Sequence, residues 1–279
     1  MKPRDRGPRA ARAAGDPPGD GPPLRLVDVG NTNICVGLCR GRELSCSGRL
    51  RTLPDETRDE FAISLGQLLS MGAVEPGGIA GAVVASVVPP LSAVVVQALE
   101  ARFGVPVLSV GPGLKTGISI RMDNPREVGA DRIVNAVAAT EIEPGGSIVV
   151  DLGTATTCDC VSPAREYLGG IIAPGLAISA DALFLRTAKL PKINIERPPR
   201  ALGKNTEQSM QSGIFYGYVA LIDGLVERLR RELDYDPAII ATGGLAQAIA
   251  DESRTIGRVE PDLTLLGLAI IWERNQEAQ

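Results

Sequence analysis

The chain has 279 residues, 44% apolar and 22% charged, which is ordinary for a globular protein and long enough for two domains. A net charge of −4 and 3% aromatic residues argue against nucleic acid as a partner, because neither a basic surface nor stacking side chains are provided. Histidine is absent, which excludes Ser-His-Asp and Cys-His catalysis and leaves acid–base chemistry to carboxylates, Lys, Tyr or Cys.

The first 23 residues include ten Pro or Gly and five Lys or Arg, and they lack the apolar core of a signal peptide. Such a segment cannot bury enough apolar surface to offset its ordering entropy. We therefore expect a disordered tail over residues 1–23, or an artefact of the assigned start. Without a targeting signal, the expected location is cytoplasmic.

The next part of the chain predicts the element order βββαβαβ. Strands joined by Gly-containing turns are expected over 24–30, 34–41 and 42–52, and an amphipathic helix with an acidic first turn over 55–72. A buried strand over 79–88, a helix over 91–104 that ends at Gly104 and a further strand over 105–111 are expected next. Pro89 and Pro90 are expected to form a turn. The uncharged stretch between Glu75 and Glu100 could span a bilayer, but Gly and Pro pairs interrupt it, so we expect no membrane span.

The second half repeats this beginning. Strands around a polar turn are expected over 147–161 and 166–175, followed by a helix over 176–190. A loop containing GKNT is expected after Pro191. A long helix from about 206 to 233, a strand over 238–244 and a closing helix over 264–276 complete the chain. Duplication of element order suggests two similar lobes, which we place at 24–138 and 139–279. The five cysteines lie in expected strands, and Cys-x-Cys without further ligands is a weak metal signal, so we interpret them as strand residues.

Two related phrases, LRLVDVGNT at 24–32 and SIVVDLGTATT at 147–157, each end a strand in Asp-x-Gly. Glycine lets the backbone approach a phosphate, and nearby hydroxyl, amide and main-chain N–H groups can donate to its oxygens. An aspartate at the strand end can hold a cation beside that phosphate. Facing copies would clasp a polyphosphate from two sides. The alternative is that Asp-Gly-type turns simply end hairpins.

Eight motifs occur in an order that resembles type III pantothenate kinases: DVGNTN, NPREVGADRIVNA, DLGTATT, GGIIAPG, TAKLP, GKNT, SGIFYGY and ATGG. The resemblance covers nearly the whole chain from Leu24 onward. It implies two ribonuclease-H-like α/β lobes of the sugar kinase and actin (ASKHA) superfamily with a cleft between them, as a homodimer. The implied activity is ATP-dependent phosphorylation of pantothenate to 4'-phosphopantothenate, the first step of coenzyme A biosynthesis.

The resemblance also assigns residues. It implies ATP contacts at Asp28, Val29, Gly30, Asn31, Thr32, Asn33, Ile34, Cys35 and Thr154, and substrate contacts at Met122, Gly129, Ala130, Asp131, Arg132 and Thr206. Asp151 matches the family's ligand for a monovalent cation, K⁺ or NH₄⁺, and Asp28 lies on the Mg²⁺-nucleotide side. The Gly-Gly turn at 241–244 lies where related kinases contact the nucleoside.

Asp131 is the expected general base, because the acceptor is a primary alcohol whose proton must leave as the phosphoryl group arrives. The alternative is that an Asp in the first turn of a helix is simply favoured by the helix dipole. Arg132 offers a fork of donors suited to the carboxylate of pantothenate, or it forms a surface ion pair with Glu127 or another acid. Met122 replaces a Tyr of many relatives, so one polar substrate contact is missing.

Two other functions fit the same fold. A regulatory accessory factor would have damaged catalytic positions, whereas Asp28, Asp131, Arg132 and Asp151 are all present. A kinase of another small alcohol is excluded only by the substrate motif, because this superfamily acts on many substrates.

Overall fold

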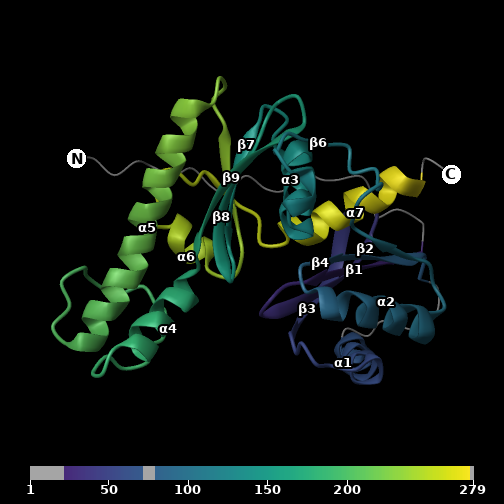
Figure 1. The fold of residues 1–279 in the computed structure, drawn as a ribbon, viewed down its shortest axis with the longest axis horizontal. Helices are drawn as coiled ribbons and strands as arrows, with labels where there is room; N and C mark the ends of the chain where they lie inside the picture. The colour runs from purple at the N-terminus through teal and green to yellow at the C-terminus, as the bar shows by residue number, and fades with distance from the viewer. Residues whose placement is uncertain (1–21, 72–78, 277–279) are drawn as a thin grey trace.

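The computed structural model describes residues 22–71 and 79–276 and places them in two lobes, each built on one sheet (Figure 1). The strand orders are β3-β2-β1-β4-β5 and β11-β10-β7-β8-β9-β6. In each sheet three consecutive strands, β1 to β3 or β7 to β9, pair antiparallel. Two later strands, β4 and β5 or β10 and β11, add in parallel on the other side of β1 or β7. The duplication of the element order is therefore a duplication of topology.

The first lobe has the predicted order βββαβαβ: β1 (Leu24–Val29), β2 (Asn33–Arg40), β3 (Glu43–Arg51), α1 (Arg58–Met71), β4 (Gly81–Ser86), α2 (Pro89–Phe103) and β5 (Val107–Ser109). The prediction of a turn at Pro89 and Pro90 is wrong. Both prolines lie in the first turn of α2, where a missing N–H leaves no helical hydrogen bond unmade. The predicted end at Gly104 is confirmed, with φ at 61° and its N–H donated to the carbonyl of Glu100.

A connecting segment contains β6 (Ser119–Ile120), the 3₁₀ turn η1 (Pro125–Glu127) and α3 (Ala130–Ile142). The sequence did not predict β6, which pairs with β9 of the second sheet. The second lobe then comprises β7 (Ser147–Leu152), β8 (Ala155–Val161), β9 (Glu166–Pro174), α4 (Leu176–Arg186), α5 (Thr206–Glu232), β10 (Ala238–Thr242), α6 (Ala246–Ala250), β11 (Arg258–Val259) and α7 (Leu263–Gln276). The short elements α6 and β11 were also not predicted.

The helices form three layers around the two sheets (Figure 1). Helices α1 and α2 cover one face of the first sheet, and α4, α5 and α6 cover the outer face of the second. Helices α3 and α7 lie between the sheets, in one apolar cluster that includes Leu26 of β1 and Val149 of β7. Gly267 allows α7 to approach α3 closely, because an added Cβ would lie 2.1 Å from the carbonyl oxygen of Val134.

The lobe division at 138/139 stays a prediction; that boundary falls within α3, and α7 packs against β1 and β4 of the first sheet. Most of the predicted tail lies outside the described residues, although the carbonyl of Pro23 accepts a hydrogen bond of 2.9 Å from the N–H of Ala80. The cysteines lie in β2, β3 and β8 as free thiols, as the sequence predicted. Among the described helices, none has the length and apolar character required to cross a bilayer.

Candidate active site

The aspartates of the two repeated phrases occupy equivalent places. Asp28 is the second-last residue of β1 and Asp151 the second-last of β7, and the two strands share one pattern of burial along their six residues. Side chains alternate along a strand, so Asp28 shares a face with Leu26 and Asp151 with Val149. Both of those apolar residues pack into the central layer of α3 and α7. The two carboxylates therefore face the same layer from opposite sheets.

The turns that follow the aspartates meet across the lobes. The hydroxyls of Thr32 and Thr154 are hydrogen-bonded to each other at 2.8 Å, although 122 residues separate them in sequence. In the first turn the N–H of Gly30 donates to the carbonyl of Asn33 at 3.1 Å, and a Cβ at Gly30 would lie 2.9 Å from that oxygen. In the second, the N–H of Gly153 donates to Ala155 at 3.1 Å. Tight turns thus bring hydroxyl and backbone donors together between the lobes.

A third carboxylate, Asp131, comes from the first turn of α3, where Gly129 is the N-cap. Its Oδ1 accepts a hydrogen bond of 2.8 Å from the N–H of Arg132. A Cβ at Gly129 would lie 2.5 Å from the same oxygen, so glycine is what leaves room for this carboxylate conformation. The predicted helix start and the predicted general base coincide here, which satisfies the helix-dipole interpretation as well.

The three carboxylates influence one another electrostatically. Burial raises the pKa of Asp28 to about 7, and the charges of Asp131 and Asp151 act in the same direction. Burial and then Asp131 raise the pKa of Asp151 to about 6, against the hydrogen bond from Asn135. Burial also raises the pKa of Asp131, with the N–H of Arg132 opposing it. Burial is thus the first cause for each of the three, and it favours the protonated form of the carboxyl group.

Asp151 is anchored by a hydrogen-bonded chain across three elements. The amide nitrogen of Asn135 on α3 donates to Asp151 Oδ2 at 3.0 Å. The hydroxyl of Thr264 on α7 donates to the Asn135 amide oxygen at 2.7 Å. The central helices therefore fix the orientation of this carboxylate, which the sequence did not predict because the three residues are far apart in the chain.

Arg132 is not a surface residue. Its side chain is 14% exposed, and it donates to Asp159 of β8 through Nε at 2.9 Å and through Nη2. The ion pair with Glu127 considered from the sequence does not form; that carboxylate accepts a hydrogen bond of 2.7 Å from Asn124. Arg132 thus forms its ion pair with Asp159, and this partner is buried rather than on the surface. Met122 packs nearby in a small apolar cluster that includes Tyr167.

A cavity of about 240 Å³ borders Asp28, with Arg49, Asp262 and Thr264 among its lining residues. The strand register places Asp28, Cys35 and Arg49 side by side on one face of β1, β2 and β3. Sequence reasoning missed Arg49, although strand alternation could have found it. The guanidinium also approaches the predicted nucleoside turn, because a Cβ at Gly244 would lie 3.8 Å from Arg49 Nη1.

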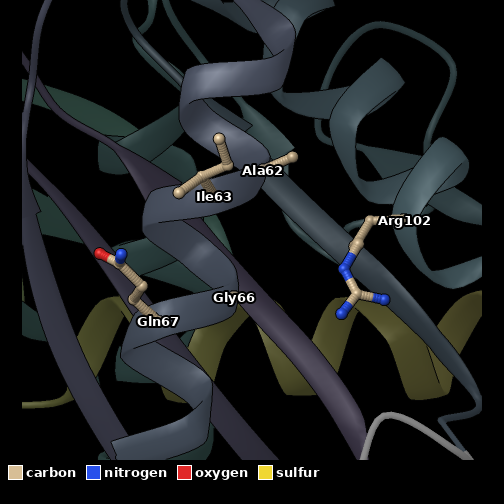
Figure 2. A pocket seen from close by; sticks show the side chains of 5 residues that line it. All are labelled: Ala62, Ile63, Gly66, Gln67 and Arg102. Carbon is tan, nitrogen blue, oxygen red and sulfur yellow. The ribbon is translucent and has the colours of Figure 1, made fainter.

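A second hollow of about 370 Å³ lies on the first lobe, and Figure 2 shows its lining side chains from α1 and α2: Ala62, Ile63, Gly66, Gln67 and Arg102. These helices pack on the sheet face that carries Val27 and Val29. Strand alternation puts Asp28 on the opposite face. This hollow is therefore separated from the carboxylates by the sheet.

The comparisons with known proteins identify the family. A family model of type III pantothenate kinases matches residues 24–228. A type III pantothenate kinase of Anaeromyxobacter sp. (strain Fw109-5) is 51% identical over 253 residues, which cover 91% of this chain and 100% of that protein. The chain belongs to the type III pantothenate kinase family. Relatives with the same name in Geobacter sulfurreducens and Bacillus cytotoxicus are 50% and 47% identical, over 91% and 90% of this chain and 100% and 95% of theirs.

Solved structures agree with the predicted fold class for this member of the type III pantothenate kinase family. A protein described as a Baf family transcriptional activator from Campylobacter jejuni aligns with a TM-score of 0.57 and 18% identity, over 91% of this chain and 100% of that one. The ethanolamine utilization protein EutJ from Carboxydothermus hydrogenoformans aligns with 0.54 and 15%, over 91% and 92%. Such identities show the fold alone. With the duplicated sheets, they confirm the predicted fold of two α/β lobes.

Thr206 is the one predicted substrate residue that the chain does not bring near the others. It is exposed at the start of α5. Tyr218 of the same helix donates to the carbonyl of Pro174 at the end of β9. Twelve residues of α-helix separate Thr206 from Tyr218, which is about 18 Å along the axis. Figure 1 shows this end of α5 beside α4, on the side of the second lobe away from α3.

The carboxylates fit a cation that is shared with a ligand. Within residues 22–71 and 79–276, no group of three or more His, Cys, Asp or Glu side chains could hold a metal ion. Mg²⁺ commonly binds to one or two carboxylates together with waters and substrate phosphates. Asp28 and Asp151 are two carboxylates of this kind, at the ends of β1 and β7.

Proposed function

We propose that this chain transfers the γ-phosphoryl group of ATP to the primary alcohol of pantothenate, giving 4'-phosphopantothenate for coenzyme A biosynthesis, with Asp131 as general base. Membership of the type III pantothenate kinase family supports the reaction. The meeting of the two Asp-x-Gly turns through Thr32 and Thr154 is the observation that carries the assignment, because a phosphate site shared by both lobes requires their donors to lie together.

The nucleotide is assigned to the first turn and its partner. Backbone and side-chain donors over 28–35, with the hydroxyl of Thr154, would surround the phosphates. The cavity beside Asp28 and the Gly-Gly turn at 241–244 both adjoin Arg49, and we assign the rest of ATP to them. Arg49 lines this cavity and would place a positive charge near the triphosphate.

Two cations are assigned to the carboxylates. Asp28 would hold Mg²⁺ bound to the nucleotide, and Asp151 would hold K⁺ or NH₄⁺. When bound, these ions would neutralise the charge that develops during phosphoryl transfer. Asp131 then accepts the proton of the attacking hydroxyl, and its raised pKa makes it a stronger base than an exposed carboxylate.

Pantothenate is assigned to the start of α3. The N–H groups and glycine around 129–130 allow close approach, and Arg132 faces the carboxylate of the substrate. Its Nε and Nη2 donate to Asp159, which leaves the Nη1 edge of the guanidinium for the substrate. Met122 offers an apolar contact without a hydroxyl.

A homodimer would complete this site. Large apolar side chains are exposed on β9, on α4 and just before α5: Ile172, Ile178, Leu183, Phe184, Leu185 and Leu202. Exposed apolar side chains on neighbouring elements are typical of a protein–protein interface. Leu202 precedes the start of α5 by four residues, so an interface here would let Thr206 of the partner subunit serve the substrate where Thr206 of the same chain is too distant.

The activity is tested by release of ADP with pantothenate and with a panel of other primary alcohols. We expect ADP release that depends on pantothenate and is much weaker with the rest of the panel. ADP release with another alcohol only would favour the alternative kinase. Absence of ADP release with every alcohol, in protein that still binds ATP, would favour the regulatory alternative.

The shared site is tested by mixing two variants, Asp131→Asn and Thr206→Ala, after dissociation and reassociation. If Thr206 acts across the dimer, each mixed dimer has one intact site, and about a quarter of the wild-type activity should return after statistical mixing. A mixture no more active than its components would place Thr206 and Asp131 in the same subunit's site or remove Thr206 from it.

A further inference from the structure

Asp159 is a buried carboxylate that neither the sequence motifs nor the family resemblance assigned to the site. It lies in β8 and is 1% exposed. Besides Arg132, its donors are the hydroxyl of Tyr167 at 2.6 Å and the hydroxyl of Thr157 at 2.9 Å. A buried ion of this kind is maintained only by such a set of donors.

The geometry restricts the guanidinium of Arg132 in two ways. Nε and Nη2 both donate to Asp159 Oδ1, at 2.9 and 2.5 Å, which fixes the edge that faces β8. The Tyr167 ring centroid lies 5.7 Å from Arg132 Cζ, within the range of a cation–π contact. Among the described residues, Nη1 has no hydrogen-bond partner. The fork therefore presents one fixed edge away from Asp159.

We propose that Asp159 is a positioning residue, which with Tyr167 orients Arg132 so that its free edge receives the carboxylate of the substrate. The inference rests on the proposed function, because it requires an acidic substrate at the start of α3. Asp159 itself does not contact the substrate or the reacting atoms. Its effect is to preorganise a pair of N–H donors for the substrate carboxylate, which an arginine free to rotate would offer only part of the time.

A double-mutant cycle on the full-length protein tests the proposal with the variants Asp159→Asn and Arg132→Gln and their combination. Asp159→Asn should raise the KM for pantothenate about tenfold or more, as loss of a charged hydrogen bond does, while the KM for ATP stays within about twofold. Because Asp159 acts through Arg132, the combination should be no worse than Arg132→Gln alone. An unchanged KM for pantothenate, or effects that multiply, would overturn the proposal.

Asp223→Asn is the matched control. Asp223 is also buried, at 3% exposure, and accepts hydrogen bonds from Ser253, Arg254 and Thr255 on the second lobe. Its replacement should lower the melting temperature without raising the KM for pantothenate. A similar rise in that KM for Asp223→Asn would mean that any buried carboxylate supports the site through the fold, and the proposal would fail.

Tyr167→Phe tests the positioning role of Asp159 if Asp159→Asn does not fold. It keeps the ring but removes one donor to Asp159, so the KM for pantothenate should rise by about two- to fivefold with little change for ATP. No change in that KM would reject the positioning role. If the wild type itself shows no pantothenate-dependent ADP release, the proposed function fails instead, which separates the two outcomes.

Discussion

The two Asp-x-Gly turns have the same place in their sheets but different surroundings. Asp151 is held by Asn135, which Thr264 holds in turn. Asp28 accepts no hydrogen bond within the described residues, and it borders a cavity of about 240 Å³. An anchored carboxylate suits a fixed ion, whereas one beside a cavity suits an ion that arrives with a ligand. The duplicated topology thus supplies two similar groups, and the helices between the sheets make them different.

The central layer also supplies what neither turn contains. Helix α3 contributes Asp131, Arg132 and Asn135 from adjacent turns, and it packs against α7 from the end of the chain. Each sheet thus provides a strand-end carboxylate, while one helix between them provides the proposed base and the proposed substrate contact. The two lobes therefore share a sheet topology, but the proposed base and substrate contact come from α3 alone.

Asp131→Asn should have the largest effect. It also tests whether the base lies in α3, as we propose, or in one of the two Asp-x-Gly turns. The variant keeps the size of the side chain but removes the proton acceptor, so turnover should fall by about 10²- to 10⁴-fold while ATP binding survives. Initial rates and ATP titration measure this, with the exposed Asp181→Asn on α4 as control. Near-normal turnover would move the base to Asp28 or Asp151.

Replacing each turn aspartate separately tests whether Asp28 and Asp151 have different roles. Asp151→Ala should abolish the response to potassium, whereas Asp28→Ala should mainly weaken the use of Mg-ATP, because we propose that each carboxylate holds a different ion. Initial rates are measured against potassium at saturating Mg-ATP, with sodium keeping the ionic strength constant. A wild-type rate indifferent to potassium, or the same defect in both variants, would make the turns two copies of one phosphate clamp.

The pH dependence of stability should distinguish the two aspartates without substrate. The pKa of Asp28 is raised from 3.8 to about 7 and that of Asp151 to about 6. The folded state therefore binds more protons than the unfolded state between pH 3.8 and about 7 for Asp28, and between pH 3.8 and about 6 for Asp151, and stability falls as pH rises through these two ranges. Asp28→Asn should reduce the fall in melting temperature between pH 6 and 7, which Asp151→Asn should leave largely unchanged. Identical slopes for wild type and Asp28→Asn would contradict the assignment.

Deleting residues 1–21 should have the smallest effect, because it touches neither turn. Their composition predicts no packing, so activity and melting temperature should stay close to those of the full chain, within about 2 °C. Pro23 is kept because its carbonyl accepts a hydrogen bond from Ala80. A melting temperature lowered by many degrees would mean that the segment docks on a lobe.

Much of the local structure was predictable from the sequence. Apolar alternation and turn residues predicted the strands around both Asp-x-Gly phrases, and Gly104 marked the end of α2. Asp131 was predicted at the start of a helix, where the structure has it. These features depend on neighbours within a few residues, so a single sequence contains their signals.

The sequence by itself determined two similar α/β halves, their repeated turns and the family. Only the tertiary structure decided that α7 packs on the first sheet, that Asn135 and Thr264 anchor Asp151, and that Asp159 holds Arg132. The hydrogen bonds among these contacts join residues 16, 129 and 27 positions apart, and α7 lies at the opposite end of the chain from β1. No local period encodes which distant side chains will meet, because that depends on how the sheets and the central helices pack together.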